Sequence, residues 1–378
     1  MSFGVEGMRK SLICILTLGI IIGMSGCGKT EEQKSGNSES QQQQESSQET
    51  IDSQELSGNK SLLTGLPVSD RVMENRPLAV MFNNIKEGCP QTGIGEADLV
   101  YEAPVEGRIT RLMGIYEDYE NLEKIGSIRS SRDYFVYFAM EYDAIYAHFG
   151  QATPYVGDLL NSDRVDNISG AVAGIERPAT KTFYRSDDRK APHNVYISTE
   201  GLLKDLEKFK YRLTKQQTET GKFQFYSEET PYYFPYSEDA TMIYPGGKDN
   251  TKANGFSKVE SRFEYDPETQ LYYRYQYGDK HIDEATGEQL AYSNVIFQYC
   301  HGEVRDENDY LAFGCHGDED RMIRVFTQGK MIPGVWSRMA DEEPAQYIDY
   351  EGNPITLTPG KTWVCIIWED YRDDVVYE

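Results

Sequence analysis

The chain has 378 residues, of which 62 are Asp or Glu and 38 are Lys or Arg, so its formal net charge is −24 at pH 7. This acidic excess excludes nonspecific nucleic-acid binding, because that activity depends on many cations facing the phosphate backbone. With only six cysteines, the fold must depend on a hydrophobic core rather than on a disulfide scaffold.

Residues 1–26 have the pattern of a lipoprotein signal peptide. Arg9 and Lys10 precede the apolar run LICILTLGIIIGM, which is shorter than the ~20 residues that a membrane-spanning helix needs. Ser25 and Gly26 stand directly before Cys27, as small residues do in a bacterial lipobox. We therefore predict that Cys27 becomes the lipidated first residue of the mature protein and that it carries palmitate. The alternative is a cleaved signal peptide with an incidental Cys27.

Residues 27–63 are predicted to form a disordered tether. They consist mainly of Ser, Gln and Glu, which offer almost nothing to bury. A flexible coil of about 33 residues has a root-mean-square reach of ~30 Å. This tether would place the folded part beyond the lipid headgroups, on the extracytoplasmic face of the cell membrane.

We predict two modules in the rest of the chain, with an α+β fold overall. Residues 64–214 alternate between strand-like and helical segments, which indicates a mixed α/β module. Strands are expected at 76–82, 97–103, 109–116, 123–129 and 142–149, and helices at 132–142 and 198–213. After the polar segment TKQQTETGK, aromatic and β-branched runs alternate with short turns, which predicts a mostly antiparallel β module at 222–378.

Two long stretches carry a resemblance to a known family. The run RPLAVMFNN, followed by PQTGIGEADLVYEAPVEGRITRLMGIY and IGSIRSSRDYF, resembles the amino-terminal module of the YerB-type lipoproteins, a bacterial family of unknown function. The run YDPETQLYYRYQYGDKHIDEATGEQLAYSNVIFQ, with GVWSRM and YEGNPITLTPGKTWV, resembles its carboxy-terminal module. The resemblance implies a two-module envelope lipoprotein of a Gram-positive bacterium and brings no established activity. A residue other than cysteine is expected in this family at the position of Cys89, which argues against an essential thiol.

Four arginines lie close together in this acidic chain: Arg108, Arg111, Arg129 and Arg132. If residues 109–116 and 124–129 form a hairpin, Arg111 lies opposite Arg129. Such a pair is unfavourable by roughly 0.2 to 1 kcal/mol unless an anion lies between the two cations. The anion is either a ligand, favoured also by the start of the helix predicted at 132–142, or a carboxylate of the protein. The candidate carboxylates are Glu102, Glu106 and Asp133.

The order of elements around these arginines is similar to the core of the LytR-CpsA-Psr phosphotransferases, which hold a polyprenyl pyrophosphate with arginines. The similarity implies that Arg111, Arg129 and Arg132 bind pyrophosphate. One of the three carboxylates would then serve a divalent metal or act as a base. Three further residues are candidates for the same cleft: His148, His193 and Asn194.

A second hairpin is predicted at residues 295–316, with its turn at DEND. Folding about this turn sets Cys300 opposite Cys315, which makes the pair a candidate disulfide. A zinc site with His301 and His316 is disfavoured, because neighbouring side chains in a strand point to opposite faces. No metal site is predicted.

The function expected from these patterns is anion or glycan binding by an envelope lipoprotein in cell-wall assembly or maintenance. A phosphotransferase acting on lipid-linked wall precursors is the second hypothesis, and a protein-protein scaffold at the membrane is the third. The partners expected are the membrane, through Cys27, and a wall glycan, a lipid-linked precursor or an envelope protein. No cofactor is expected, except the metal of the phosphotransferase hypothesis. No Walker, H-E-x-x-H, EF-hand or G-x-S-x-G motif identifies catalytic residues.

Overall fold

The computed structural model of the protein describes residues 58–216 and 221–378. The predicted signal peptide, the lipidation site at Cys27 and most of the predicted tether lie outside these ranges. Within them, no helix has both the length and the apolar character that crossing a membrane requires.

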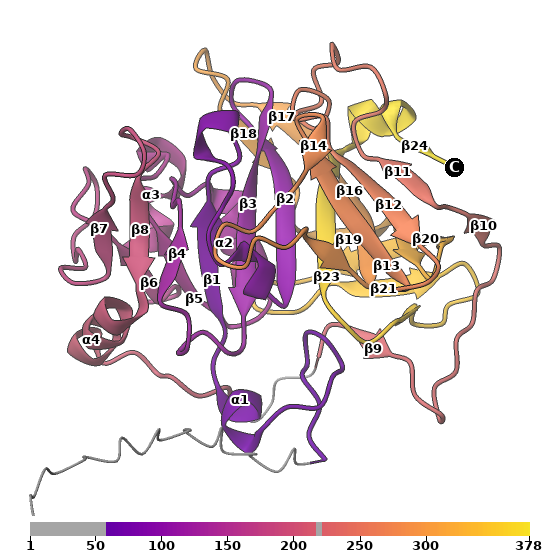
Figure 1. The fold of residues 1–378 in the computed structure, drawn as a ribbon, viewed down its shortest axis with the longest axis horizontal. Helices are drawn as coiled ribbons and strands as arrows, with labels where there is room; N and C mark the ends of the chain where they lie inside the picture. The colour runs from indigo at the N-terminus through magenta and orange to yellow at the C-terminus, as the bar shows by residue number, and fades with distance from the viewer. Residues whose placement is uncertain (1–57, 217–220) are drawn as a thin grey trace, which may run out of the picture. The chain divides into compact units, whose positions relative to one another are not determined.

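The largest element is an eleven-stranded sheet with strands from both halves of the chain (Figure 1). Its order is β10-β20-β19-β16-β23-β2-β3-β1-β5-β6, and β21 pairs with β20. The strands from the first half are β1 (Leu78–Phe82), β2 (Leu99–Val105), β3 (Ile109–Tyr116), β5 (Ile145–His148) and β6 (Asn167–Ser169). Those from the second half are β10 (Glu238–Asp239), β16 (Asn294–Cys300), β19 (Gly317–Thr327), β20 (Lys330–Arg338), β21 (Gln346–Asp349) and β23 (Thr362–Trp368).

Strand β23 joins the two halves, because it lies between β16 and β2 and runs parallel to both. All residues of β2 and β16 are buried, as expected of central strands covered on both faces. The residues on either side of the polar segment 214–222 therefore share one sheet, and each of the two hydrophobic clusters contains residues from both halves.

Smaller sheets surround the large one. A six-stranded sheet contains β11 (Met242–Tyr244), β12 (Arg262–Asp266), β13 (Leu271–Gln276), β14 (Asp279–Lys280), β15 (Ala291–Tyr292) and β24 (Val376–Tyr377). A three-stranded sheet contains β4 (Lys124–Gly126), β7 (Phe183–Arg185) and β8 (Val195–Ser198). The remaining pairs are β9 (Gln224–Phe225) with β22 (Thr356–Leu357), and β17 (Gly302–Val304) with β18 (Leu311–Phe313).

The helices are α1 (Asp70–Glu74), α2 (Asp133–Met140), α3 (Thr153–Leu160) and α4 (Thr199–Phe209). Helices α2 and α4 confirm the two predicted helices. Helix α3 was not predicted, because TPYVGDLL is short and contains Gly157; Pro154 sits at its start, where proline is tolerated. The described chain is therefore α+β but richer in strands than predicted.

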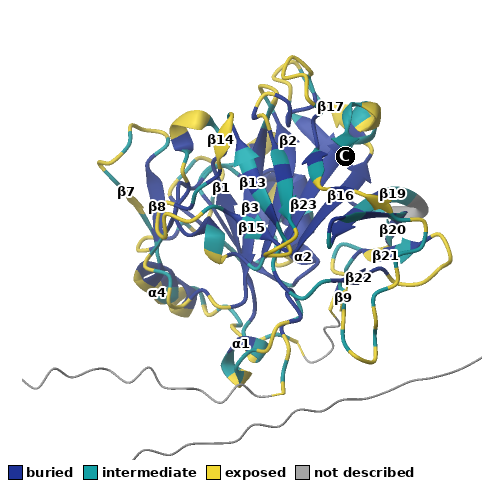
Figure 2. Ribbon diagram, turned by 45° about the vertical axis from the view of Figure 1, so that its right-hand side comes forward, coloured by how far each residue is buried: buried dark blue, intermediate teal, exposed yellow. Residues whose placement is uncertain are grey.

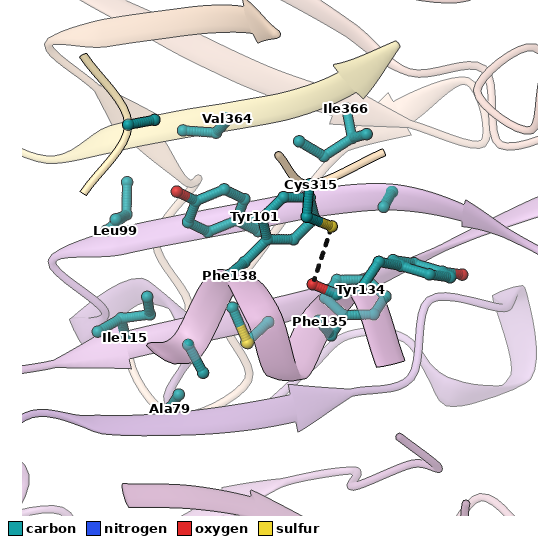
Figure 3. Close-up of a cluster of buried hydrophobic side chains, with 14 of the residues drawn as sticks. Ala79, Leu99, Tyr101, Ile115, Tyr134, Phe135, Phe138, Cys315, Val364 and Ile366 are labelled. Carbon is teal, nitrogen blue, oxygen red and sulfur yellow. Dashed lines mark hydrogen bonds between the residues drawn. The ribbon is translucent and has the colours of Figure 1, made fainter. Parts of the chain in front are cut away.

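Helix α2 covers one face of the large sheet (Figure 3). The ring of Phe138 stacks on that of Tyr101, with 5.0 Å between centroids. Val364 and Ile366 of β23 belong to the same cluster, so the core is continuous across both halves. Figure 2 shows the central strands mostly buried and the exposed residues mostly in loops.

Candidate functional site

The candidate site lies where the parallel strands β1 and β5 end. The segment Ser127–Arg132 enters between these two strand ends: the Arg129 amide donates to the Met81 carbonyl at 3.1 Å, and the Phe149 amide donates to the Arg129 carbonyl at 3.0 Å. Ligands in open sheets bind at such carboxyl ends of parallel strands. The local backbone therefore presents Arg129 at a position that suits ligand binding.

This placement corrects the predicted arginine hairpin. Strand β3 pairs with β2 and β1, whereas β4 pairs with β8, so Arg111 lies opposite Ala103 rather than Arg129. The physical reason is burial. Strand β3 is almost entirely buried, so its backbone groups need a hydrogen-bonded partner strand along both edges. The three-residue β4 is too short to be one of these partners.

Two helices begin beside this segment. Helix α2 starts after Arg132 and α3 after Ala152, and Ser131 and Gln151 form a parallel bridge between the two starts. In the described part of the chain, neither start has a capping side chain. Free amide groups and two helix dipoles therefore favour negative charge at one place.

Three arginines reach the same segment. Arg111 Nη1 donates to the Ser130 carbonyl at 2.8 Å, and Arg132 Nη1 donates to the Ser131 carbonyl at 2.6 Å. Arg129 Nη1 lies 3.5 Å from the Pro192 carbonyl. We call Arg111, Arg129 and Arg132 the arginine cluster.

Only one member of the cluster has a carboxylate partner among the described residues. Arg132 forms a bidentate pair with Glu106, with distances of 2.7 and 2.6 Å. Burial, with the nearby guanidinium groups of Arg132 and Arg129, lowers the pKa of Arg111, and burial and Arg132 lower the pKa of Arg129. Because a guanidinium stays protonated at neutral pH, Arg111 and Arg129 place two positive charges here without a paired carboxylate of their own, although the Glu106 carboxylate that pairs with Arg132 also attracts Arg111.

Several buried polar atoms around the cluster have no hydrogen-bond partner within the described residues. They are Ser127 Oγ, Arg129 Nε and both amide atoms of Gln151. Buried polar groups are normally hydrogen-bonded, so each of these atoms has capacity for solvent or a ligand.

The predicted cleft histidines lie nearby. His148 is fully buried, its Nδ1 is 2.8 Å from the Gly150 carbonyl, and burial lowers its pKa to about 4, so it is neutral at pH 7. His193 Nδ1 is 3.0 Å from Asn83 Nδ2, and burial and Arg129 lower its pKa. Asn194 bonds Arg185 and the Ser186 carbonyl instead, so it holds a loop and does not join the cluster.

Two of the predicted carboxylates have other partners. Arg111 lies opposite Ala103 of β2, and Glu102, the next residue, points to the other face of that strand. Glu102 accepts a hydrogen bond from Arg274 Nη2 at 2.8 Å, and both side chains are fully buried. Asp133 pairs with Arg305 at 2.6 Å. The sequence offers no signal for either arginine, because both come from the second half of the chain. Arg108 is exposed in the turn between β2 and β3, outside the buried cluster.

The predicted cysteine hairpin has the expected register. Gly302 pairs with Phe313, and extending this ladder by two residues sets Cys300 opposite Cys315. Both are buried free thiols in the structure, so no disulfide is formed, and burial raises the pKa of each. Burial also raises the pKa of Cys89 to about 12, which does not suit a nucleophile. Within the described ranges, no cluster of three or more His, Cys, Asp or Glu side chains could hold a metal.

Comparisons with known proteins identify the family. Residues 63–212 match the model described as "Protein of unknown function (DUF3048) N-terminal domain", and residues 252–364 match the corresponding C-terminal domain. A Bacillus subtilis (strain 168) protein named as a lipoprotein, YerB, is 30% identical over 309 residues, which cover 82% of this chain and 86% of that protein. The crystal structure of B. subtilis YerB is similar with a TM-score of 0.69 and 27% identity, over 85% of this chain and 99% of that one.

Proposed function

The chain belongs to the DUF3048 family, and we propose that it is a lipid-anchored extracytoplasmic protein whose arginine cluster binds a phosphate-like group of a cell-wall polymer or its precursor. The anchor is Cys27. The name of the B. subtilis relative supports this part of the proposal, together with the lipobox pattern before Cys27.

One observation carries the binding proposal: Arg111 and Arg129 have no carboxylate partner among the described residues. Arg111 is buried and Arg129 is half-buried, and a charge withdrawn from water without a partner costs up to several kcal/mol in an apolar interior, less where it is partly exposed. A bound anion would remove most of this cost. The protein's own carboxylate does so only for Arg132.

The chemistry of the site fits a phosphate-like group. Guanidinium groups bind phosphate through two parallel hydrogen bonds, and Arg129 Nε is a buried donor that is still free. The unsatisfied amides at the starts of α2 and α3 add donors on the same side. A ligand with several phosphate-like oxygens would satisfy more of these donors than a single carboxylate.

Binding is better supported than transfer. A phosphotransferase would need a carboxylate beside the arginines for a metal or as a base. Glu106 is held by Arg132 and Asp133 by Arg305, while Glu102 lies on the other face of the sheet. These ion pairs leave none of the three carboxylates available for that role.

Isothermal titration of the purified full chain with sodium pyrophosphate tests the proposal. Pyrophosphate should bind, the affinity should fall as salt rises, and Arg129→Ala should weaken binding by about tenfold or more. Arg71→Ala is the matched control, because Arg71 has the same charge but pairs with Asp118 and Glu120. No binding by the wild type, or equal loss in both variants, would contradict the proposal.

A further inference from the structure

A cavity lies in the second half of the chain, where β11 ends and β12 begins. Its volume is about 460 Å³, within the range of roughly 300–1,000 Å³ that is typical of small-molecule sites. The lining side chains used below are Tyr244, Lys248, Asn250, Glu260, Ser261 and Arg262. We call this cavity the β11–β12 pocket.

The frame of the pocket is rigid. Ile243 pairs with Phe263 across β11 and β12, which places Tyr244 beside Arg262 at the end of the ladder. Behind them, Asn254 Nδ2 donates to the Gly246 carbonyl at 3.0 Å and Asn254 Oδ1 accepts from the Ser257 amide at 2.9 Å. A Cβ atom added at Gly246 would lie 2.4 Å from the Ser257 nitrogen. The loop is therefore preorganised, which lowers the entropy cost of binding a ligand.

One polar atom of the pocket is buried without a partner. Ser261 is 2% exposed, and its hydroxyl has no hydrogen bond within the described residues. Glu260, next to it, has a φ of 52°, in the left-handed region that glutamate rarely adopts. Strained backbone of this kind concentrates at ligand sites. The free hydroxyl is the observation that points to a ligand.

The remaining polar groups suit a ligand with hydroxyl groups. Glu260 supplies carboxylate oxygens, one of which accepts from Asn250 Nδ2 at 3.3 Å. Tyr244 is partly buried and contributes an aromatic ring to the wall. Lys248 Nζ lies 5.1 Å from the centroid of this ring, so a ligand would contact the part of the ring that Lys248 leaves uncovered. A few directed polar groups beside an aromatic ring are the usual lining of small-molecule sites. A pyranose has hydroxyls for the polar groups and C–H bonds for the ring.

The charges of the pocket do not favour an anionic ligand. Lys248 Nζ is paired with the Glu378 carboxylate at 2.5 Å, and Arg262 Nε with that of Glu264 at 3.0 Å. Each cation therefore already has a counter-ion, in contrast to Arg111 and Arg129. No net positive charge remains to attract an anion.

From these observations we propose that the β11–β12 pocket binds one sugar unit of a neutral glycan. Tyr244 packs against the ring, and Glu260 and Ser261 bond its hydroxyls. The proposal does not depend on the arginine cluster, since the two sites share no residue.

Saturation-transfer difference NMR on the purified full chain tests this proposal, with chitotriose, cellotriose and maltotriose as neutral probes. At least one trisaccharide should bind. Tyr244→Ala and Glu260→Gln should each weaken that binding by about tenfold, because a ring contact or a hydrogen bond to a charged group is lost. Glu260 is exposed, so its variant should fold normally even if Tyr244→Ala does not.

Tyr236→Ala is the matched control, because Tyr236 is 65% exposed and does not line the pocket. Its binding should equal that of the wild type. Binding of none of the three trisaccharides would overturn the proposal. So would undiminished binding by folded Glu260→Gln.

Discussion

The charge of Arg111, which has no paired carboxylate of its own, makes a direct prediction about stability. In Arg132→Met, the Glu106 carboxylate loses a bidentate partner in a site where the two side chains are 10% and 18% exposed. Breaking one side of such a pair costs about 3–5 kcal/mol when fully buried, so we expect a loss of roughly 2–3 kcal/mol here. In Arg111→Met, the hydrogen bond to the Ser130 carbonyl is lost, together with an attraction to the Glu106 carboxylate that is weaker than the repulsion from Arg132 and Arg129; the lost hydrogen bond costs about 1–3 kcal/mol.

The loss in Arg111→Met is offset, because the repulsion from Arg129 and Arg132 that lowers the pKa of Arg111 disappears with the charge. Methionine also keeps much of the buried aliphatic stem. We therefore expect the free energy of unfolding of Arg111→Met to lie within about 1 kcal/mol of the wild type. Urea unfolding followed by circular dichroism, in phosphate-free buffer, measures both variants. If Arg111→Met loses as much stability as Arg132→Met, Arg111 has an internal counter-ion and the anion-site argument fails.

Three other predictions address the anchor, the hairpin and the buried histidine. Cys27→Ala should abolish labelling by a palmitate analogue and release the protein from the membrane fraction; a variant that still labels would contradict lipidation at Cys27. Under mild diamide oxidation of the native protein, Cys300 and Cys315 should stay reduced, because both thiols are buried and burial raises the pKa of each; peptide mapping that finds either residue in a disulfide would contradict this. The buried neutral His148, with a pKa near 4 against 6.5 when unfolded, should reduce stability as pH falls from about 6.5 to 4, because the unfolded chain binds the proton first. This loss, about 3 kcal/mol in full, should be smaller in His148→Phe, and equal pH profiles for the two proteins would refute it.

The local pattern of the fold was predictable because it depends on neighbouring residues. Strands β1, β3, β16 and β23 coincide with apolar runs, and α4 begins directly after its N-cap residue Ser198, whose side chain accepts from the Gly201 amide at 3.3 Å. The pairing of strands was not predictable in the same way. The sequence favoured a hairpin of β3 with β4, but nothing in it indicates that β1 would lie beside β3 or that β23 would pair with β2.

In the candidate site too, the local features were predictable from the sequence and the tertiary contacts were not. The closeness of the arginines follows from Arg129 and Arg132 lying three residues apart, and the sequence found that. Their partners depend on tertiary structure: Glu106 reaches Arg132 over 26 residues, and Glu102 pairs with Arg274 over 172. The starts of α2 and α3 are joined by the parallel bridge between Ser131 and Gln151, which lies outside the named strands, and α3 itself was missed.

The central claim is that Arg111 and Arg129 bind an anion between the ends of β1 and β5. A crystal structure of the protein grown with pyrophosphate tests it most directly. The account predicts phosphate oxygens within hydrogen-bond distance of the Arg129 and Arg111 guanidinium groups, beside the starts of α2 and α3. Pyrophosphate bound elsewhere, with both guanidinium groups still in contact only with the Ser130 and Pro192 carbonyls, would contradict it.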